Sequence, residues 1–146
     1  MAFTELIYVS TMVGEAEHAL KAILESSVRH NQLHGITGML LYCRGRFIQV
    51  LEGGEAEVMK TYARIGDDPR HQHVTTLATT KVQRRHFGSW SMGFKHVSAS
   101  EIAQFPQLAQ IFDLQIPLNA VNAKPGLALE MLSLFGTGLV WRAAAA

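Results

Sequence analysis

The strongest constraint on the fold is a short apolar run bounded by glycines, from Gly45 to Gly53, which carries one amide at its centre, Gln49. Apolar and aromatic residues between glycines are typical of a buried strand. Alternation along a strand places Phe47, Gln49 and Leu51 on one face, so the amide points into a packed layer. An unpaired buried amide costs about 1–3 kcal/mol. Either the protein itself or a ligand must therefore hydrogen-bond to Gln49.

The composition is typical of a folded protein with one domain and an appendage. The chain has 146 residues, of which 48% are apolar and 17% charged, and its net charge of +1 offers no basic surface for nucleic acid or acidic membranes. Cys43 is alone and the N-terminus lacks a signal-like segment, so we expect a reducing, cytoplasmic location. The apolar segments are shorter than the roughly 18 residues that a membrane helix needs, so no membrane span is predicted.

The hydrophobic periodicity predicts the element order βαββαββ over the first 97 residues. Apolar positions at helical spacing predict helices from Glu15 to Asn31 and over residues 55–66. Arg44 and Gly45 form the turn of a predicted hairpin. The five strands are expected over residues 6–10, 35–43, 47–51, 73–82 and 87–97.

Residues 98–146 have a different character and form a predicted helical extension. Ser100 and Glu101 are expected to cap a helix that is interrupted at Pro106, and a linker over residues 116–124 follows. A last helix, over residues 125–135, has leucines around almost its whole circumference, so we expect it to cover the second face of the sheet or a partner chain. The final alanines, 143–146, are interpreted as a frayed end or a cloning remnant.

Polar side chains from three predicted elements are directed at one layer of the fold. Two helices on one face of a sheet leave a groove, in which Ile23 and Ile65 would form apolar jaws. A planar heteroaromatic ligand with carbonyl and N–H groups would satisfy the amides there, but so would an internal hydrogen-bond network. The polar residues of this layer are Tyr8, Ser27, Asn31 and Gln49.

Other chemistries find less support in the sequence. The pairs His30/His34 and His71/His73 have spacings that metals use, yet no cysteine pair or carboxylate–histidine motif completes a shell, so no metal site is predicted. G-x-S-x-G, G-x-G-x-x-G and G-x-x-x-x-G-K motifs are absent, and the glycine pair at 53–54 is best interpreted as a turn.

Over about residues 3–96 the sequence resembles the BLUF domains, the sensors of blue light that use FAD. The resemblance implies an α+β, ferredoxin-like fold with a mixed five-stranded sheet, a flavin ring between the two helices, and C-terminal helices on the other face. It divides the chain into a photosensor domain, 1–97, and a helical cap or output extension, 98–146. The matching residues are Tyr8, Asn31, the Gly-Ile-Thr-Gly stretch 35–38, Phe-Ile-Gln-Val-Leu-Glu-Gly at 47–53, Asp-Pro-Arg-His at 68–71, and Arg-His-Phe-Gly-Ser-Trp-Ser-Met-Gly-Phe at 85–94.

The resemblance also implies roles around the ring. Asn31 would bond its C4 carbonyl and N3 edge, while Gln49 would lie between Tyr8 and its N5/O4 edge. FAD is the implied cofactor, with FMN or riboflavin as substitutes. The remaining roles are a clamp formed by Ile23 and Ile65, a bond from Arg70 to the far carbonyl side, contact of Asp68 with the ribityl hydroxyls, and flanking positions for His30 and His71.

By the same resemblance, light drives an electron from Tyr8 to the flavin while Gln49 relays the proton. The Gln49 amide then rotates or changes tautomer, which strengthens its bond to O4 and shifts the absorption to the red. The signal would leave through the strand at 87–97, where Met92 or Trp90 lies nearest Gln49; alternation predicts that both share one face.

The expected protein is therefore a non-enzymatic photoreceptor that signals to a separate partner protein, or through a homo-oligomer. Two alternatives stay open at the level of sequence. One is a small flavin-dependent oxidoreductase that uses the same groove; the other is a ligand-binding interaction module without photochemistry, in which Gln49 is simply part of the core.

Overall fold

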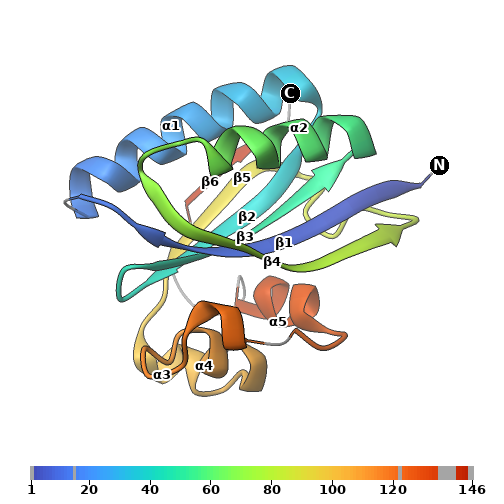
Figure 1. The fold of residues 1–146 in the computed structure, drawn as a ribbon. Coiled ribbons are helices and arrows are strands. Elements are labelled where there is room, and N and C mark those ends of the chain that lie inside the picture. Colours follow the sequence, from blue (N-terminus) through green and yellow to red (C-terminus); the bar gives the residue numbers. More distant parts are fainter. Residues whose placement is uncertain (1, 15, 122, 135–140, 145–146) are drawn as a thin grey trace.

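The fold is one six-stranded sheet with helices on both faces (Figure 1). A computed structural model describes residues 2–14, 16–121, 123–134 and 141–144. In chain order the elements are β1 (Phe3–Met12), α1 (Ala16–His34), β2 (Thr37–Cys43), β3 (Arg46–Gly53), α2 (Glu55–Gly66), β4 (His71–Val82), β5 (Trp90–His96), α3 (Ala99–Ile102), α4 (Pro106–Ile111), the 3₁₀ turn η1 (Leu118–Ala120), α5 (Leu127–Ser133) and β6 (Trp141–Ala144).

The strand order β4-β1-β3-β2-β5 confirms the mixed, ferredoxin-like sheet, with β6 added beyond β5. β1 lies antiparallel between β3 and β4, and β2 pairs antiparallel with β3 and parallel with β5. The β2–β3 hairpin turns at Arg44 and Gly45, whose φ angles are 53° and 81°. Positive φ at both turn positions is the two-residue geometry that matches strand twist, and it fixes the register of Gln49.

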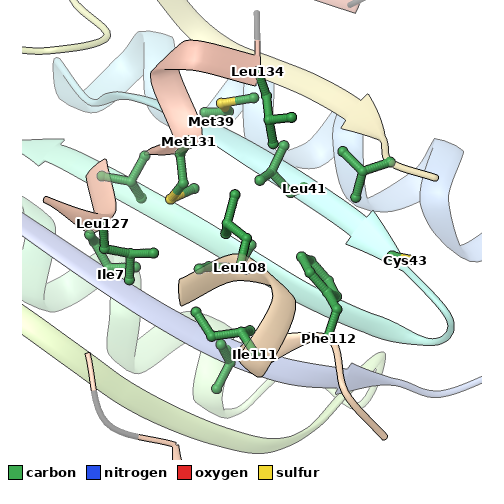
Figure 2. Close-up of a cluster of buried hydrophobic side chains, with 14 of the residues drawn as sticks. Ile7, Met39, Leu41, Cys43, Leu108, Ile111, Phe112, Leu127, Met131 and Leu134 are labelled. Atoms are coloured by element: carbon green, nitrogen blue, oxygen red, sulfur yellow. The ribbon is translucent and has the colours of Figure 1, made fainter. Parts of the chain in front are cut away.

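Alternation along the central strands divides the core between the two faces. Tyr8 and Leu51 face α1 and α2, whereas Ile7, Val9, Ile48 and Val50 face the C-terminal helices. Figure 2 shows the second cluster, in which side chains of β1 and β2 meet those of α4 and α5. We call the first side the groove face and the second the cap face. The predicted covering of the second face by C-terminal helices is confirmed.

Two buried cations attach the cap to the sheet. Arg46 of β3 donates to the carbonyl oxygens of Ile111, Asp113 and Ile116 at 2.9–3.0 Å. Lys95 of β5 lies 2.7 Å from a carboxylate oxygen of Glu101 in α3. Arg46 stands three residues before Gln49 on β3, so the strand that carries the central amide is tied directly to the cap.

Several predicted boundaries are corrected. The cap of α3 is Ser98, whose side chain accepts from the Glu101 backbone N–H in a capping box, because Glu101 stands three residues after it. α1 continues past Asn31 to His34, since its last turn still packs against α2 through side-chain hydrogen bonds. Leu129 in α5 is exposed, so that helix is not buried around its whole circumference.

The C-terminal alanines were wrongly expected to fray: β6 pairs with β5 through Ala143 and Ala144. Glu15 and Phe135, the predicted ends of two helices, lie outside the described residues, as do the last two alanines. The described helices include none that is long and apolar enough to cross a membrane.

Candidate functional site

The groove face is organised around a hydrogen bond between the two central strands. Tyr8 and Gln49 are register partners on β1 and β3, and both side chains are buried. The Tyr8 hydroxyl donates to the amide oxygen of Gln49. The polar layer predicted from the sequence thus begins with a direct phenol–amide pair.

Met92 of β5 completes a three-residue chain across the groove face. The Gln49 Nε2 atom donates to the Met92 sulfur at 3.6 Å, and Met92 is fully buried. A thioether is a weak acceptor, so this amide N–H group is held loosely. Gln49 therefore has a strong partner on its oxygen and a weak partner on its nitrogen.

The expectation that Trp90 and Met92 share a face is wrong. Trp90 packs against the cap-face cluster, whereas Met92 belongs to the groove-face cluster with Ile23 and Phe47. The β5–β6 pairing shifts register between Trp90 and Met92, and a turn from Phe87 to Trp90 precedes the strand. Such a bulge breaks strict alternation, so Trp90 turns away from Gln49.

Two further rings surround Tyr8. The Tyr62 ring lies 5.4 Å away between centroids, and the His71 ring lies 6.4 Å away edge-on. Burial, and then the nearby Tyr62 and Asp68, raise the pKa of Tyr8 above its ordinary value, so the phenol stays protonated. Burial likewise lowers the pKa of His71, whose Nδ1 lies 2.9 Å from the Ser10 hydroxyl. Tyr8 is therefore surrounded mainly by aromatic rings, with the Asp68 carboxylate close enough to raise its pKa further.

The second predicted amide, Asn31, is also buried on the groove side of α1. Its Nδ2 atom donates to the Ser91 carbonyl oxygen of β5 at 2.7 Å, which fixes the amide plane. His30 contacts Thr61 of α2 at 2.8 Å, and its pKa is lowered by burial and by Arg64. These contacts tie α1 to β5 and to α2 at one end of the groove.

A cleft of about 30 Å³ between α1 and α2 brings together most of the remaining predicted residues. Arg70 is one of its lining residues, and its guanidinium pairs with the Asp68 carboxylate and also donates to the Ser26 hydroxyl at 3.1 Å. The hydrogen bond from Arg70 lowers the pKa of Asp68. Lining residues that the sequence predicted are Ile23, Ser27, Gln49, Ile65, Asp68, Arg70 and His71.

His30 and Asn31 lie outside this lining. Asn31 instead borders a neighbouring cavity of about 210 Å³ that also contacts Ser91 and Arg85. Gln49 lines the first cavity and Asn31 the second, so the two predicted amides border different hollows of the structure.

The family model described as BLUF, sensors of blue light using FAD, matches residues 3–93. The chain belongs to the BLUF family. Its members are flavin-dependent blue-light sensors, and the buried Tyr8–Gln49 hydrogen bond is the arrangement expected of a photoactive one.

Similar proteins include BLUF-containing receptors of different sizes. The chain is 38% identical over 112 residues to the photoactivated adenylate cyclase subunit beta of Euglena gracilis, which covers 74% of this chain but 13% of that protein. It is 33% identical over 90 residues to the blue light- and temperature-regulated antirepressor BluF of Escherichia coli strain K12, covering 61% of this chain and 22% of that protein. The chain thus spans a small part of these curated relatives.

A solved structure matches the BLUF chain over nearly its whole length. The dark-state structure of BlrB, a BLUF protein, superposes with a TM-score of 0.72 at 28% identity and covers 94% of this chain and 97% of that one. The match extends beyond residue 93, so the helical cap is part of the shared architecture.

The residue types of the groove fit a flavin ring. Its edge offers carbonyl oxygens and N–H groups, which amide side chains such as Asn31 and Gln49 can both donate to and accept from. The branched side chains of Ile23 and Ile65 suit its flat faces. The hydrogen bond from Arg70 to Ser26 joins two residues of the cleft lining, so we expect flavin entry to compete with it.

Replacing Ser26 with alanine should speed flavin uptake. The variant removes the hydroxyl that holds Arg70 across the cleft, a hydrogen bond worth about 0.5–1.5 kcal/mol, so the association rate should rise roughly two- to tenfold. Stopped-flow quenching of FMN fluorescence by apoprotein measures that rate. Ser133→Ala, which removes an exposed helical serine bonded to the Leu129 carbonyl, is the matched control. Equal association rates for the two variants would show that the hydrogen bond from Arg70 to Ser26 does not slow flavin uptake.

Sequence reasoning missed Ser26, Thr61, Tyr62 and Ser91. The serine and threonine residues gave no local signal, because their partners come from other elements. Tyr62 is one of the apolar positions at helical spacing that predict the helix over residues 55–66. That spacing did not place its ring beside Tyr8, where the structure has it.

Proposed function

We propose that the chain binds FAD in the groove and converts blue light into a rearranged hydrogen-bond network at Gln49. Support comes from one observation above all: Tyr8, Gln49 and Met92 form a continuous buried chain from β1 through β3 to β5. These two hydrogen bonds link an oxidisable phenol to an amide that can both donate and accept, and link that amide to β5, the strand that leads into the cap.

In the proposed holoprotein, Ile23 and Ile65 hold the ring on its two faces, and Asn31 and Gln49 bond its polar edge. Arg70, once released from Ser26, reaches the far carbonyl, and Asp68 binds the ribityl hydroxyls. Ser27, His30 and His71 flank the cofactor. The adenine end of FAD would lie outside the cleft, so FMN or riboflavin should substitute.

A bound flavin supplies a strong one-electron oxidant when it absorbs blue light. Tyr8 gives up an electron, and its proton has a ready acceptor because the hydroxyl already bonds the Gln49 oxygen. The lasting change is then in the hydrogen bonds of the Gln49 amide. Among the described residues its nitrogen donates to the Met92 sulfur, a weak acceptor, so exchanging the donor and acceptor ends of the amide costs little on that side. The electron and the proton would then return to Tyr8, which restores the phenol, while the Gln49 amide keeps its exchanged orientation and presents a different edge to its neighbours.

The proposed output passes along β5 into the cap. Loss of the Gln49 contact changes the position of Met92, and Lys95 lies three residues further along the same strand, paired with Glu101 of α3. We expect a separate signalling protein, or a second copy of this chain, to read the cap. Relatives carry the sensor in adenylate cyclase subunits, whose catalytic part is not in these 146 residues, and we propose a non-enzymatic, cytoplasmic receptor without nucleic-acid or membrane partners.

Lys95→Met should separate light sensing from output. The variant keeps the groove residues, so the spectral response should be unchanged, but it removes the buried pair with Glu101 that connects β5 to α3. Hydrogen–deuterium exchange in dark and light measures the response of residues 90–102. The wild type should exchange faster in light, and Lys95→Met should lose that difference in α3. Lys21→Met, on the exposed side of α1, serves as the control; an intact α3 response in Lys95→Met would contradict this route.

A further inference from the structure

Two glutamates stand directly opposite each other on the cap face of the sheet. Glu5 of β1 and Glu52 of β3 are register partners, and their exposed fractions are 6% and 0%. Like charges at directly opposed positions destabilise a sheet, and burying a carboxylate is costly without compensation. A pair of this kind requires a positive partner or a shared proton.

His86 completes the cluster from the segment between β4 and β5. Its Nδ1 atom lies 2.6 Å from Glu5 Oε2 and 3.5 Å from Glu52 Oε2. Glu52 also accepts from the backbone N–H groups of His86 and Phe87 at 2.7 and 2.8 Å, which fixes its carboxylate. One ligand atom from each of the three side chains lies within 4.8 Å of the other two.

Two of the permanent cations near the cluster, Arg85 and Lys81, are engaged elsewhere. The Arg85 guanidinium donates to the Thr37 hydroxyl and to the carbonyl oxygens of Gly35 and Glu52, and Lys81 is bound by Thr4 and Glu55. Within the described residues, neither cation pairs with either carboxylate of the cluster. Burial and the hydrogen bond with Glu5 accordingly raise the pKa of Glu52 to about 7.

A cavity opens onto this cluster from the cap side. It has a volume of about 430 Å³ and lies between β1, β4 and the segment that leads into α5. Glu5 and His86 form part of its wall, together with Ile7, Lys124 and Leu127. A small ion in this cavity can therefore contact the Glu5 carboxylate and the His86 imidazole, behind which Glu52 is buried, without disturbing the groove face.

We infer that Glu5, Glu52 and His86 form a binding site for one divalent transition-metal ion, with Zn²⁺ as the best match. One imidazole nitrogen and two carboxylate oxygens are a ligand set that Zn²⁺ accepts, whereas Ca²⁺ and Mg²⁺ prefer six or more oxygens. A fourth position would face the cavity and take water. The ion would brace β1, β3 and the segment that precedes β5.

The geometry requires only a small adjustment. Ligands at about 2.0–2.2 Å from a tetrahedral ion lie roughly 3.3 Å apart. The Glu52–His86 distance of 3.5 Å already suits this, and the Glu5–His86 pair must open from 2.6 Å. About a third of the His86 side chain is exposed, at 32%, so the imidazole has room to move.

Isothermal titration of ZnCl₂ into the metal-stripped, flavin-loaded protein of 146 residues tests the site. One ion per chain should bind, with proton release visible as a dependence of the heat on the buffer's ionisation enthalpy. Glu5→Gln and His86→Gln should each weaken binding at least about tenfold. Zn²⁺ should raise the melting temperature of the wild type but not that of the variants. Circular dichroism without metal verifies that the variants fold. If Glu5→Gln does not fold, His86→Gln still tests the site, because the His86 side chain is partly exposed and tolerates replacement better.

His34→Gln is the matched control, because His34 forms a similar histidine–glutamate contact with Glu57 at the surface. It should leave the affinity unchanged. The inference is overturned if the wild type binds no Zn²⁺, which would mean that the pair holds a proton only. It is equally overturned if binding is lost in His34→Gln and retained in His86→Gln.

Discussion

A Gln49→Glu protein is expected to bind flavin and to lose most or all of the light-induced red shift. In the structure the Gln49 oxygen accepts from Tyr8 while its nitrogen donates towards Met92, and only an amide can exchange these two roles by turning over. A carboxylate is an acceptor at both oxygens, so rotating it leaves the pattern of donors and acceptors unchanged. The flavin-bound fraction and the light-minus-dark spectrum are the two measurements.

The matched control for this substitution is Gln83→Glu, which makes the same change at an exposed position after β4. Its spectrum should equal that of the wild type. Gln49→Leu, which removes donor and acceptor together, should abolish the shift completely. A shift of normal size in Gln49→Glu would refute the amide switch, because the acid cannot reproduce the exchange.

Tyr8→Phe should also abolish the shift, for a different reason. The variant keeps the ring and its packing but removes the electron-donating phenol and the proton that the Gln49 oxygen accepts. It should also lower the free energy of unfolding by about 1–3 kcal/mol, since a buried amide oxygen loses its donor. Absorption before and after illumination, together with chemical denaturation, measures both effects.

Tyr62→Phe is the closest control, because Tyr62 lies 5.4 Å from Tyr8 and its hydroxyl bonds Thr76 rather than Gln49. It should retain the shift. If Tyr8→Phe responded to light as strongly as Tyr62→Phe, the phenol–amide pair would not be the photochemical centre.

The sheet and its groove were predictable because local periodicity determines which face each residue takes. Tyr8 and Gln49 could be placed on one face from alternation alone, and Asn31 from its position on the inner stripe of α1. The turn at Arg44 and Gly45 then set the register. These are local properties, and the structure confirms the fold that they imply.

The two faces of β5 could not be predicted, because a bulge is decided by pairing with a distant segment. The register shift occurs against β6, of which Ala143 and Ala144 were interpreted as part of a frayed end or a cloning remnant. Alternation without that bulge placed Trp90 beside Met92, which is wrong.

Side-chain contacts between elements that are distant in the sequence could not be predicted from the sequence either. The bond from Arg70 to Ser26 and the three bonds from Arg46 to the cap join residues 44 to 70 positions apart, and each residue type is ordinary in its own segment. The opposed pair of Glu5 and Glu52 follows from the β1–β3 register, which the sequence did not supply.

The most direct test of the central claim is the absorption spectrum of the flavin-loaded wild type before, during and after a brief exposure to blue light. We expect a small red shift of the flavin band that reverses completely in the dark, because only the hydrogen bonds around Gln49 have changed. An unchanged spectrum, or lasting bleaching of the flavin band, would contradict it.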